Sequence, residues 1–206
     1  MIGSDPDMIF RIPALLITLT VHEYAQARTA VALGDPTPRV LGRLTLNPIP
    51  HLDPLGLIMM WLFKFGWAKP VPINPDNFKS RRQGIILVAL AGPVSNILLA
   101  IVTAIIIVLL SMFNLVKGEW IKVLWLTYSY NIIFAVFNLL PFPPLAGAKV
   151  VSNLLPGRLS YAYERLEPYA PWILLALAYF GFISILTRPV EYALSSFINS
   201  IIRLIF

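Results

Sequence analysis

The feature that most constrains this chain is a stretch of 34 residues without Asp, Glu, Lys or Arg, between Arg82 and Lys117. At about 1.5 Å per residue a helix of that length would cover ~50 Å, more than the ~30 Å hydrocarbon core of a bilayer. Part of the stretch must therefore be loop, tilt or kink, and Pro93 is the expected point of disturbance. The stretch predicts a membrane-spanning segment.

The composition of the whole chain supports this prediction. Hydrophobic residues make up 58% of the 206 residues and charged residues 13%, against roughly 25% charged in an ordinary soluble domain. We therefore exclude a disordered chain, a coiled coil and an ordinary water-soluble enzyme. Cysteine is absent, which excludes disulfides, thiolate metal sites and cysteine nucleophiles.

Four main transmembrane helices are expected. They are the first apolar segment, Met8 to Leu33, and the ranges 84–112, 123–140 and 168–187. The apolar range 55–65 is too short to cross and predicts a re-entrant or interfacial piece, while 192–206 predicts either an interfacial helix or a short extra span. A β-prone run at 40–46, flanked by prolines, predicts a short strand or hairpin.

The expected fold is thus an all-α polytopic membrane protein with a small membrane-associated β element. Residues 1–206 are expected to form a single domain, because an appended recognition domain of about 100 residues would have no room.

Basic residues predict the orientation. With four crossings, residues 28–82 and 141–167 share one side, which carries eleven Lys and Arg residues against four on the other. The richer side is expected to be cytoplasmic, in a multi-pass protein of the cell membrane. The net charge of +6 is attributed to the basic residues that set the orientation in the membrane, and no nucleic-acid partner is expected.

Two ionisable residues, His22 and Glu23, interrupt the first apolar segment, and a charge at that depth suggests a functional role. His22 and Gln26 are four residues apart and share one helical face. In His-Glu-x-x-His, this spacing offers two imidazoles to one zinc ion, and the Glu is the general base for its water. Here Gln26 replaces the second histidine, and a polar pair facing a bundle interior explains the motif equally well.

Several further motifs occur in order along the chain: His22–Ala27, Gly42–Pro48, His51–Pro54, Phe65–Pro75, Ala91–Asn96 and Asn138–Gly147. Together they resemble the site-2 protease family, which are intramembrane zinc metalloproteases. The resemblance covers about residues 9–150 and is to the compact prokaryotic members without a PDZ or CBS domain, leaving 151–206 as C-terminal helices.

The resemblance implies a role for each matched position in the reaction centre. His22 matches the first zinc ligand and Glu23 the catalytic acid/base. Gln26 stands at the position of the second histidine ligand, and Ala146 at that of the aspartate that supplies the third.

The resemblance also implies positions for substrate binding. Asn138 and Pro141 match the Asn-x-x-Pro motif that lines the substrate cleft in the family, and Gly92 and Asn96 match the small and polar positions of the central helix. The range 39–47 matches the β-structure to which substrate is thought to add as a strand. The implied substrate is a membrane protein with a transmembrane segment.

The departures from the family pattern predict an inactive chain. Catalytic zinc normally has three protein ligands and a water, whereas only His22 remains here, since a glutamine amide is a weak donor and alanine has none. Zinc implied by the resemblance is therefore expected to bind weakly or not at all. Both changes could be a deliberate disarming of an active protease, or mark a natural pseudoprotease that binds transmembrane segments.

Two alternative functions and the roles of two further residues stay open on the sequence. A non-catalytic scaffold would capture transmembrane segments without cleaving them. A small proton-coupled transporter would use His22 and Glu23 as a proton relay, although no inverted repeat is visible. His51 is either a loop histidine without a role, or a substitute ligand or substrate contact, and Asn131 is expected to be an ordinary interhelical hydrogen-bond partner.

Overall fold

The computed structural model describes residues 8–54, 56, 68–115 and 118–206, and this part of the chain is helical with no strands. The α-helices are α1 (Met8–Ala32), α2 (Thr37–Val40), α4 (Arg81–Met112), α5 (Ile121–Asn138), α6 (Ala146–Leu154), α7 (Gly157–Glu164), α8 (Ala170–Tyr179) and α9 (Phe182–Ile205). In the described residues, three short 3-10 helices join them: η1 (Ile49–His51), η2 (Pro75–Asn77) and η3 (Glu167–Tyr169).

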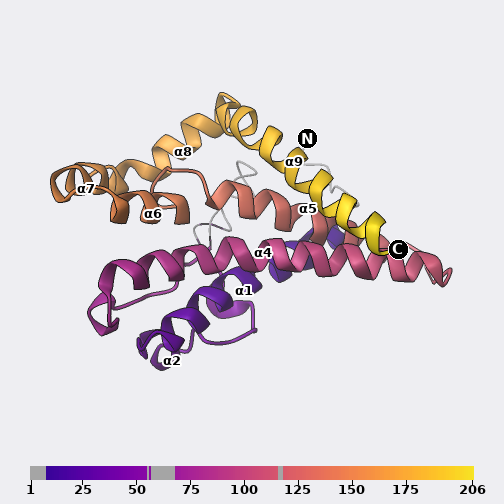
Figure 1. Cartoon of the computed structure of the whole chain (residues 1–206), viewed down its shortest axis with the longest axis horizontal. Helices are drawn as coiled ribbons and strands as arrows, with labels where there is room; N and C mark the ends of the chain where they lie inside the picture. The colour runs from indigo at the N-terminus through magenta and orange to yellow at the C-terminus, as the bar shows by residue number, and fades with distance from the viewer. Residues whose placement is uncertain (1–7, 55, 57–67, 116–117) are drawn as a thin grey trace.

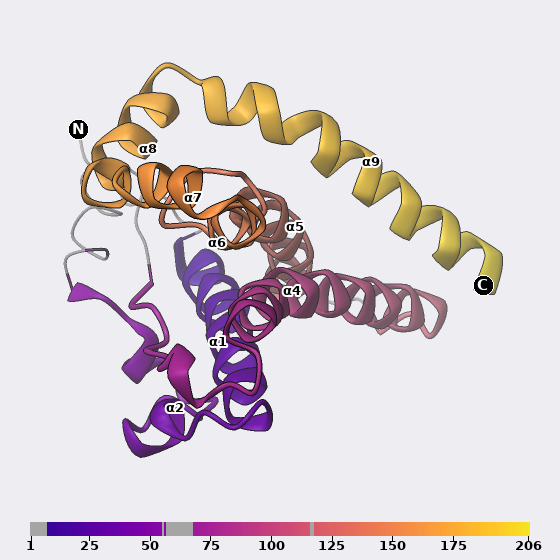
Figure 2. The same ribbon diagram turned by 60° about the vertical axis from the view of Figure 1, so that its left-hand side comes forward.

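Helices α1, α4 and α5 pack against one another and form the centre of the molecule (Figures 1 and 2). Small side chains on α1, such as Ala14, Ala27 and Ala30, are fully buried and let the helices approach closely. Farther along α4, Ala100 and Ala104 pack with Ile132 of α5 and with Ile198 of α9. This second cluster attaches the C-terminal helix to the bundle.

Two of the described helices, α1 and α4, are long and apolar enough to cross a membrane, and α8 with α9 makes a third if the bent pair counts as one span. The expected membrane class is therefore confirmed, but the structure supports two or three spans by length and composition rather than four. Helix α5 has 18 residues, about 27 Å, and does not meet the same criterion. Helix α4 continues without a break through Pro93.

The range 168–187, which was expected to cross the membrane once, is not a single helix. Helix α8 ends at Tyr179, and Gly181 adopts a φ of 75°, which L-residues rarely take. The chain then turns by 77° into α9, which runs on to Ile205 (Figure 2). The expected segment 192–206 is therefore the second half of a longer helix.

The predicted β element at 39–47 is also wrong. Thr37–Val40 forms a single helical turn, because Pro38 fixes a φ angle that suits the first turn of a helix. Gly42 follows with a φ of 68°, and Arg43 is drawn inward, away from any strand pairing. The predicted re-entrant piece at 55–65 lies outside the described residues except for Gly56.

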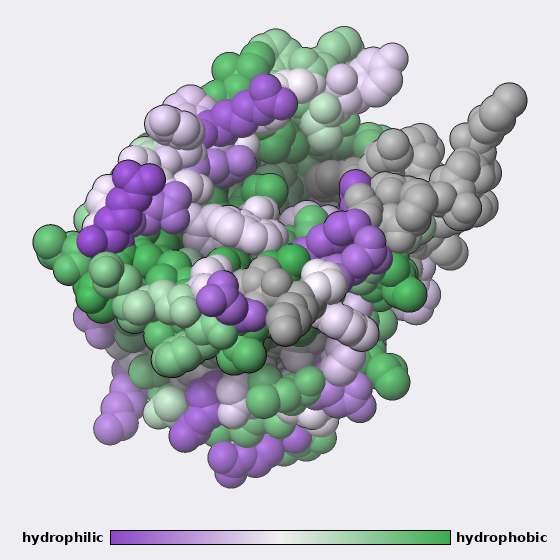
Figure 3. Space-filling model, turned by 90° about the vertical axis from the view of Figure 1, so that its right-hand side faces the viewer, coloured by the Kyte–Doolittle hydropathy of each residue, from purple (hydrophilic) through white to green (hydrophobic). Residues whose placement is uncertain are grey.

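Segments that were expected on one side of the membrane lie at one end of the molecule. The C-terminal end of α1, helix α2, the start of α4, and helices α6 and α7 gather on the left of Figure 1. The outward face of α4 carries Leu87, Val94, Leu98 and Val102, each at least half exposed. Figure 3, which shows the right-hand end of the molecule in Figure 1, has apolar patches interspersed with polar groups.

Candidate metal centre

His22 and Glu23 lie in the middle of the three-helix core and not on its lipid-facing side. They are 3% and 6% exposed, respectively, although they sit in an apolar helix. Their neighbours on α1 at 18, 27 and 30 are also buried, so this face of α1 is the one that α4 and α5 cover. Both side chains are therefore available to a site inside the protein.

A buried hydrogen-bond network orients the His22 ring. Nδ1 of His22 lies 2.6 Å from Oδ1 of Asn96, while Nδ2 of Asn96 donates to Thr18 O at 3.0 Å and to Asn131 Oδ1 at 2.7 Å. Because the Asn96 oxygen is the acceptor in this arrangement, Nδ1 of His22 carries the proton. The lone pair of His22 is thus on Nε2, the tautomer that a metal-binding histidine with such a partner adopts.

Two neighbours fix the plane of that ring. Gly92 on α4 lies directly against it, and a Cβ there would come within 2.7 Å of His22 Cδ2. Phe134 on α5 meets the ring edge-on, with centroids 5.2 Å apart. Glycine at position 92 is therefore required by the close approach of the two helices.

The Gln26 side chain lies in front of Nε2 of His22, the nitrogen that does not contact Asn96. Its Nε2 lies 3.1 Å from Nε2 of His22, one helical turn away on α1. Since the His22 nitrogen carries a lone pair, the Gln26 amide donates a hydrogen bond to it. The atom that would ligate a metal is thus already bonded within the protein.

The Glu23 carboxylate lies among positive charges and accepts a hydrogen bond from the backbone N–H of Val71. Its Oε2 is buried and makes no hydrogen bond. Arg43, from the loop after α2, and Lys149, from α6, both interact with it electrostatically. Lys149 also acts on His22, which shows that α6 reaches the same region of the bundle.

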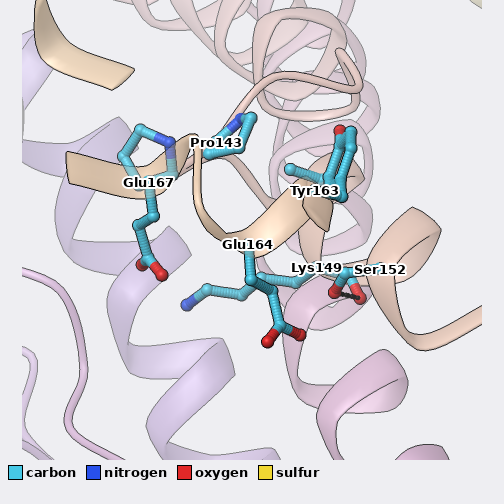
Figure 4. A pocket seen from close by; sticks show the side chains of 8 residues that line it. Pro143, Lys149, Ser152, Tyr163, Glu164 and Glu167 are labelled. Atoms are coloured by element: carbon cyan, nitrogen blue, oxygen red, sulfur yellow. Dashed lines mark hydrogen bonds between the residues drawn. The ribbon is translucent and has the colours of Figure 1, made fainter. Parts of the chain in front are cut away.

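Ala146 begins α6 and is buried where this helix packs on α4. The next residue, Gly147, lies so close to the end of α5 that a Cβ would come within 2.5 Å of Leu140 O. Lys149 follows one turn after Ala146. With Glu164 and Glu167 it forms the charged end of a shallow pocket, opposite Pro143 and Tyr163 (Figure 4).

The residues predicted to line the substrate cleft have different environments. Asn96 is fully buried, and its amide is occupied by His22, Thr18 and Asn131. Asn138 is half-buried and donates to Phe134 O at 2.9 Å, and Pro141 is exposed, with its carbonyl accepting from Tyr163 Oη. Asn131 is the interhelical partner that its position predicted.

The donor set does not fit a zinc ion. Among the described residues, no group of three or more His, Cys, Asp and Glu side chains could hold a metal. His22 is the one strong donor at positions 22, 26 and 146, and its nitrogen is bonded to Gln26. A tetrahedral zinc site with an open position needs three protein ligands.

His51 cannot substitute for the missing ligands. It is fully buried, and Nε2 lies 2.9 Å from Thr45 O, so this nitrogen donates and the lone pair is on Nδ1. Nη2 of Arg43 lies 3.4 Å from Nδ1. Burial, together with the charge of Arg43, lowers the pKa of His51 below its ordinary 6.5, so the ring is neutral at pH 7.

Fold and site together define an all-helical membrane protein with a buried His-Glu pair between its central helices. The chain is 37% identical over 178 residues to a protein of Bacillus subtilis, which carries the provisional name zinc metalloprotease YwhC; the match covers 82% of this chain and 80% of that protein. It is also 31% identical over 176 residues to Rip2 of Mycobacterium tuberculosis (strain H37Rv), provisionally a zinc metalloprotease, over 81% of this chain and 65% of Rip2. Rip2 of Mycolicibacterium smegmatis is 30% identical over 152 residues, 68% of this chain and 54% of that protein.

The chain therefore belongs to the site-2 protease family of zinc metalloproteases. No family model and no solved structure matches it.

Proposed function

We propose that this chain is a site-2 protease scaffold that accepts a transmembrane segment of a membrane protein but does not hydrolyse it as written. The observation that carries the proposal is the hydrogen bonding of the two nitrogens of the His22 ring. Asn96 orients it as a metal ligand, whereas the Gln26 amide occupies the nitrogen that would bind the metal. The orientation is that of a metalloprotease, but the ligand set is incomplete.

In a chain with the family ligands restored, residues at positions 22, 26 and 146 would hold zinc, which would supply an acidified water, and Glu23 would be the general base and acid. Water in bulk has a pKa of about 15.7, so a carboxylate alone does not activate it at neutral pH. Glu23 therefore has no competent nucleophile in the present chain. Asn138 and Pro141, at the end of α5, are proposed to contact the unwound substrate.

Restoring the ligands tests this proposal. Gln26→His together with Ala146→Asp should introduce cleavage of a transmembrane substrate in proteoliposomes, because both changes restore the ligands that the family resemblance implies at these positions. The matched control adds Glu23→Gln to the repaired chain and should abolish cleavage. Cleavage by the unrepaired chain, or by the repaired chain carrying Glu23→Gln, would refute the proposal.

A second function, capture of transmembrane segments by a natural pseudoprotease, is favoured by one observation. The bond from Gln26 leaves no unsatisfied ring nitrogen on His22, so the metal-free site needs no further partner there. This function predicts that the repaired chain still binds transmembrane segments without cleaving them. Cleavage after repair would instead favour a protease that has been disarmed.

A further inference from the structure

Arg43 is a buried cation whose side chain has no individual role in the family resemblance, which assigns only the range 39–47 as a whole. It is only 5% exposed, although its neighbour in sequence Arg39 is exposed at the end of α2. Arginine is almost never buried unless its charge has a partner, because removing it from water is costly. The position therefore requires an explanation in the protein's interior.

Part of the explanation is structural. Nη2 of Arg43 donates to Lys69 O at 2.5 Å, and Nη1 donates to Pro70 O at 3.2 Å, across 26 and 27 residues of sequence. The backbone N–H of Lys69 in turn donates to His51 O at 3.0 Å. The two terminal nitrogens of the Arg43 guanidinium thus connect the beginning of the segment 43–70 to its end.

The guanidinium also lies in the region of Glu23, since Arg43 donates to Pro70 O and the Glu23 carboxylate accepts from the N–H of the next residue, Val71. Nε of Arg43 is buried and makes no hydrogen bond, and the same is true of Oε2 of Glu23. The two side chains interact electrostatically. The two hydrogen bonds hold the Arg43 guanidinium in place, and its positive charge acts on the Glu23 carboxylate of α1.

We propose that Arg43 is a positioning residue for Glu23: bonds to the carbonyls of Lys69 and Pro70 fix its guanidinium so that its charge orients the Glu23 carboxylate. Lys149 cannot replace it, because that ammonium is carried by a half-buried flexible side chain on α6. The inference rests on the proposed role of Glu23 as the acid/base.

The first test needs no activity and uses the unrepaired full chain in detergent at one pH. The infrared spectrum of each protein minus that of its Glu23→Gln counterpart isolates the Glu23 carboxyl band. Arg43→Gln should shift this band, and Arg43→Lys, which keeps the charge, should leave it closer to its original position. The matched control Arg39→Gln, an exposed cation four residues earlier, should leave it unchanged. An unmoved band in Arg43→Gln overturns the proposal.

Arg43→Gln removes buried hydrogen bonds and could prevent folding, in which case Arg43→Lys decides the matter. Thermal unfolding of the parent, Arg43→Lys, Glu23→Gln and the double variant forms a double-mutant cycle. The proposal requires a coupling free energy between positions 43 and 23, because moving the positive charge in Arg43→Lys should matter only when the Glu23 carboxylate is present. Additive effects overturn it.

The second test uses the repaired chain, with Gln26→His and Ala146→Asp. There Arg43→Gln should lower kcat by about tenfold to a hundredfold with a much smaller change in KM, because a misplaced base slows the chemical step. Arg43→Lys should recover part of the loss. Equal losses in the Gln and Lys variants would contradict positioning by charge. If the repaired chain does not cleave, the proposed active form fails and the pseudoprotease is favoured, while the infrared test still decides the role of Arg43.

Discussion

Asn96 determines which nitrogen of His22 faces the candidate metal centre. Its amide oxygen accepts a hydrogen bond from Nδ1, and its nitrogen donates to Thr18 O and Asn131 Oδ1 on two other helices. His22 and Glu23 could be predicted as site residues from the sequence, since ionisable groups in an apolar segment are exceptional. Thr18 and Arg43 could not, because their roles depend on contacts with segments distant in sequence.

Loss of the Asn96 amide should destabilise the protein. Asn96→Ala leaves Nδ1 of His22 and Oδ1 of Asn131 buried without a partner, at a cost of about 1–3 kcal/mol for each group left unsatisfied. Thermal unfolding in detergent measures this cost. Asn153→Ala, which removes a half-buried amide that bonds only within α6, is the matched control and should cost less. Equal effects of the two substitutions would contradict the network.

A methyl group at position 92 should displace the His22 ring. Gly92→Ala places a Cβ within 2.7 Å of His22 Cδ2, so either the ring or the α1–α4 contact must shift. We expect a loss of about 1–3 kcal/mol in the free energy of unfolding. Gly157→Ala, where a Cβ meets nothing within 4 Å, is the control and should be neutral. A neutral Gly92→Ala would mean that the helices are not in close contact here.

At the scale of elements, hydropathy predicted α1 and α4 well, because long apolar runs leave the chain no alternative in a bilayer. The β-prone run at 40–46 gave a wrong prediction, since Pro38 and the burial of Arg43 outweigh the strand preference of Val40 and Leu46. Hydropathy did not predict the bend at Gly181, because a glycine has the same hydropathy value whether its φ angle is positive or negative.

Asp35 accepts hydrogen bonds from residues in the chain segments between α1 and α4, and it should make the stability of the fold depend on pH. Burial alone would raise its pKa, but hydrogen bonds from Thr37, Asn77 and Asn74 lower it below the ordinary 3.8. A carboxylate with a lowered pKa stabilises the fold above its unfolded value, and this contribution is lost as the pH falls through the folded value.

Asp35→Asn should therefore lower the melting temperature at neutral pH, and the difference from the parent should shrink as the pH falls below about 3.8. Melting curves between pH 3 and pH 7 measure it. Asp76→Asn, whose ion pair with Arg81 is exposed, is the control and should change stability by less than about 1 kcal/mol. A difference for Asp35→Asn that is constant over this pH range would contradict the assignment.

At the scale of the whole molecule, the arrangement of segments agrees with the charge bias, since both basic stretches lie at one end. The chain contains no cysteine, so single cysteines report topology without background. Ser80→Cys should react with an impermeant maleimide only from the cytoplasmic side of the membrane, and Glu119→Cys only from the outside. Labelling of both from the same side would contradict a single crossing by α4.

The central claim is that the chain keeps the fold of a zinc metalloprotease but not its ligands, and zinc content measures it most directly. Elemental analysis of the purified chain and of its Gln26→His, Ala146→Asp variant, prepared side by side, should give zinc well below stoichiometry in the first and about one ion per chain in the second. A full equivalent of zinc in the chain as written would contradict the account.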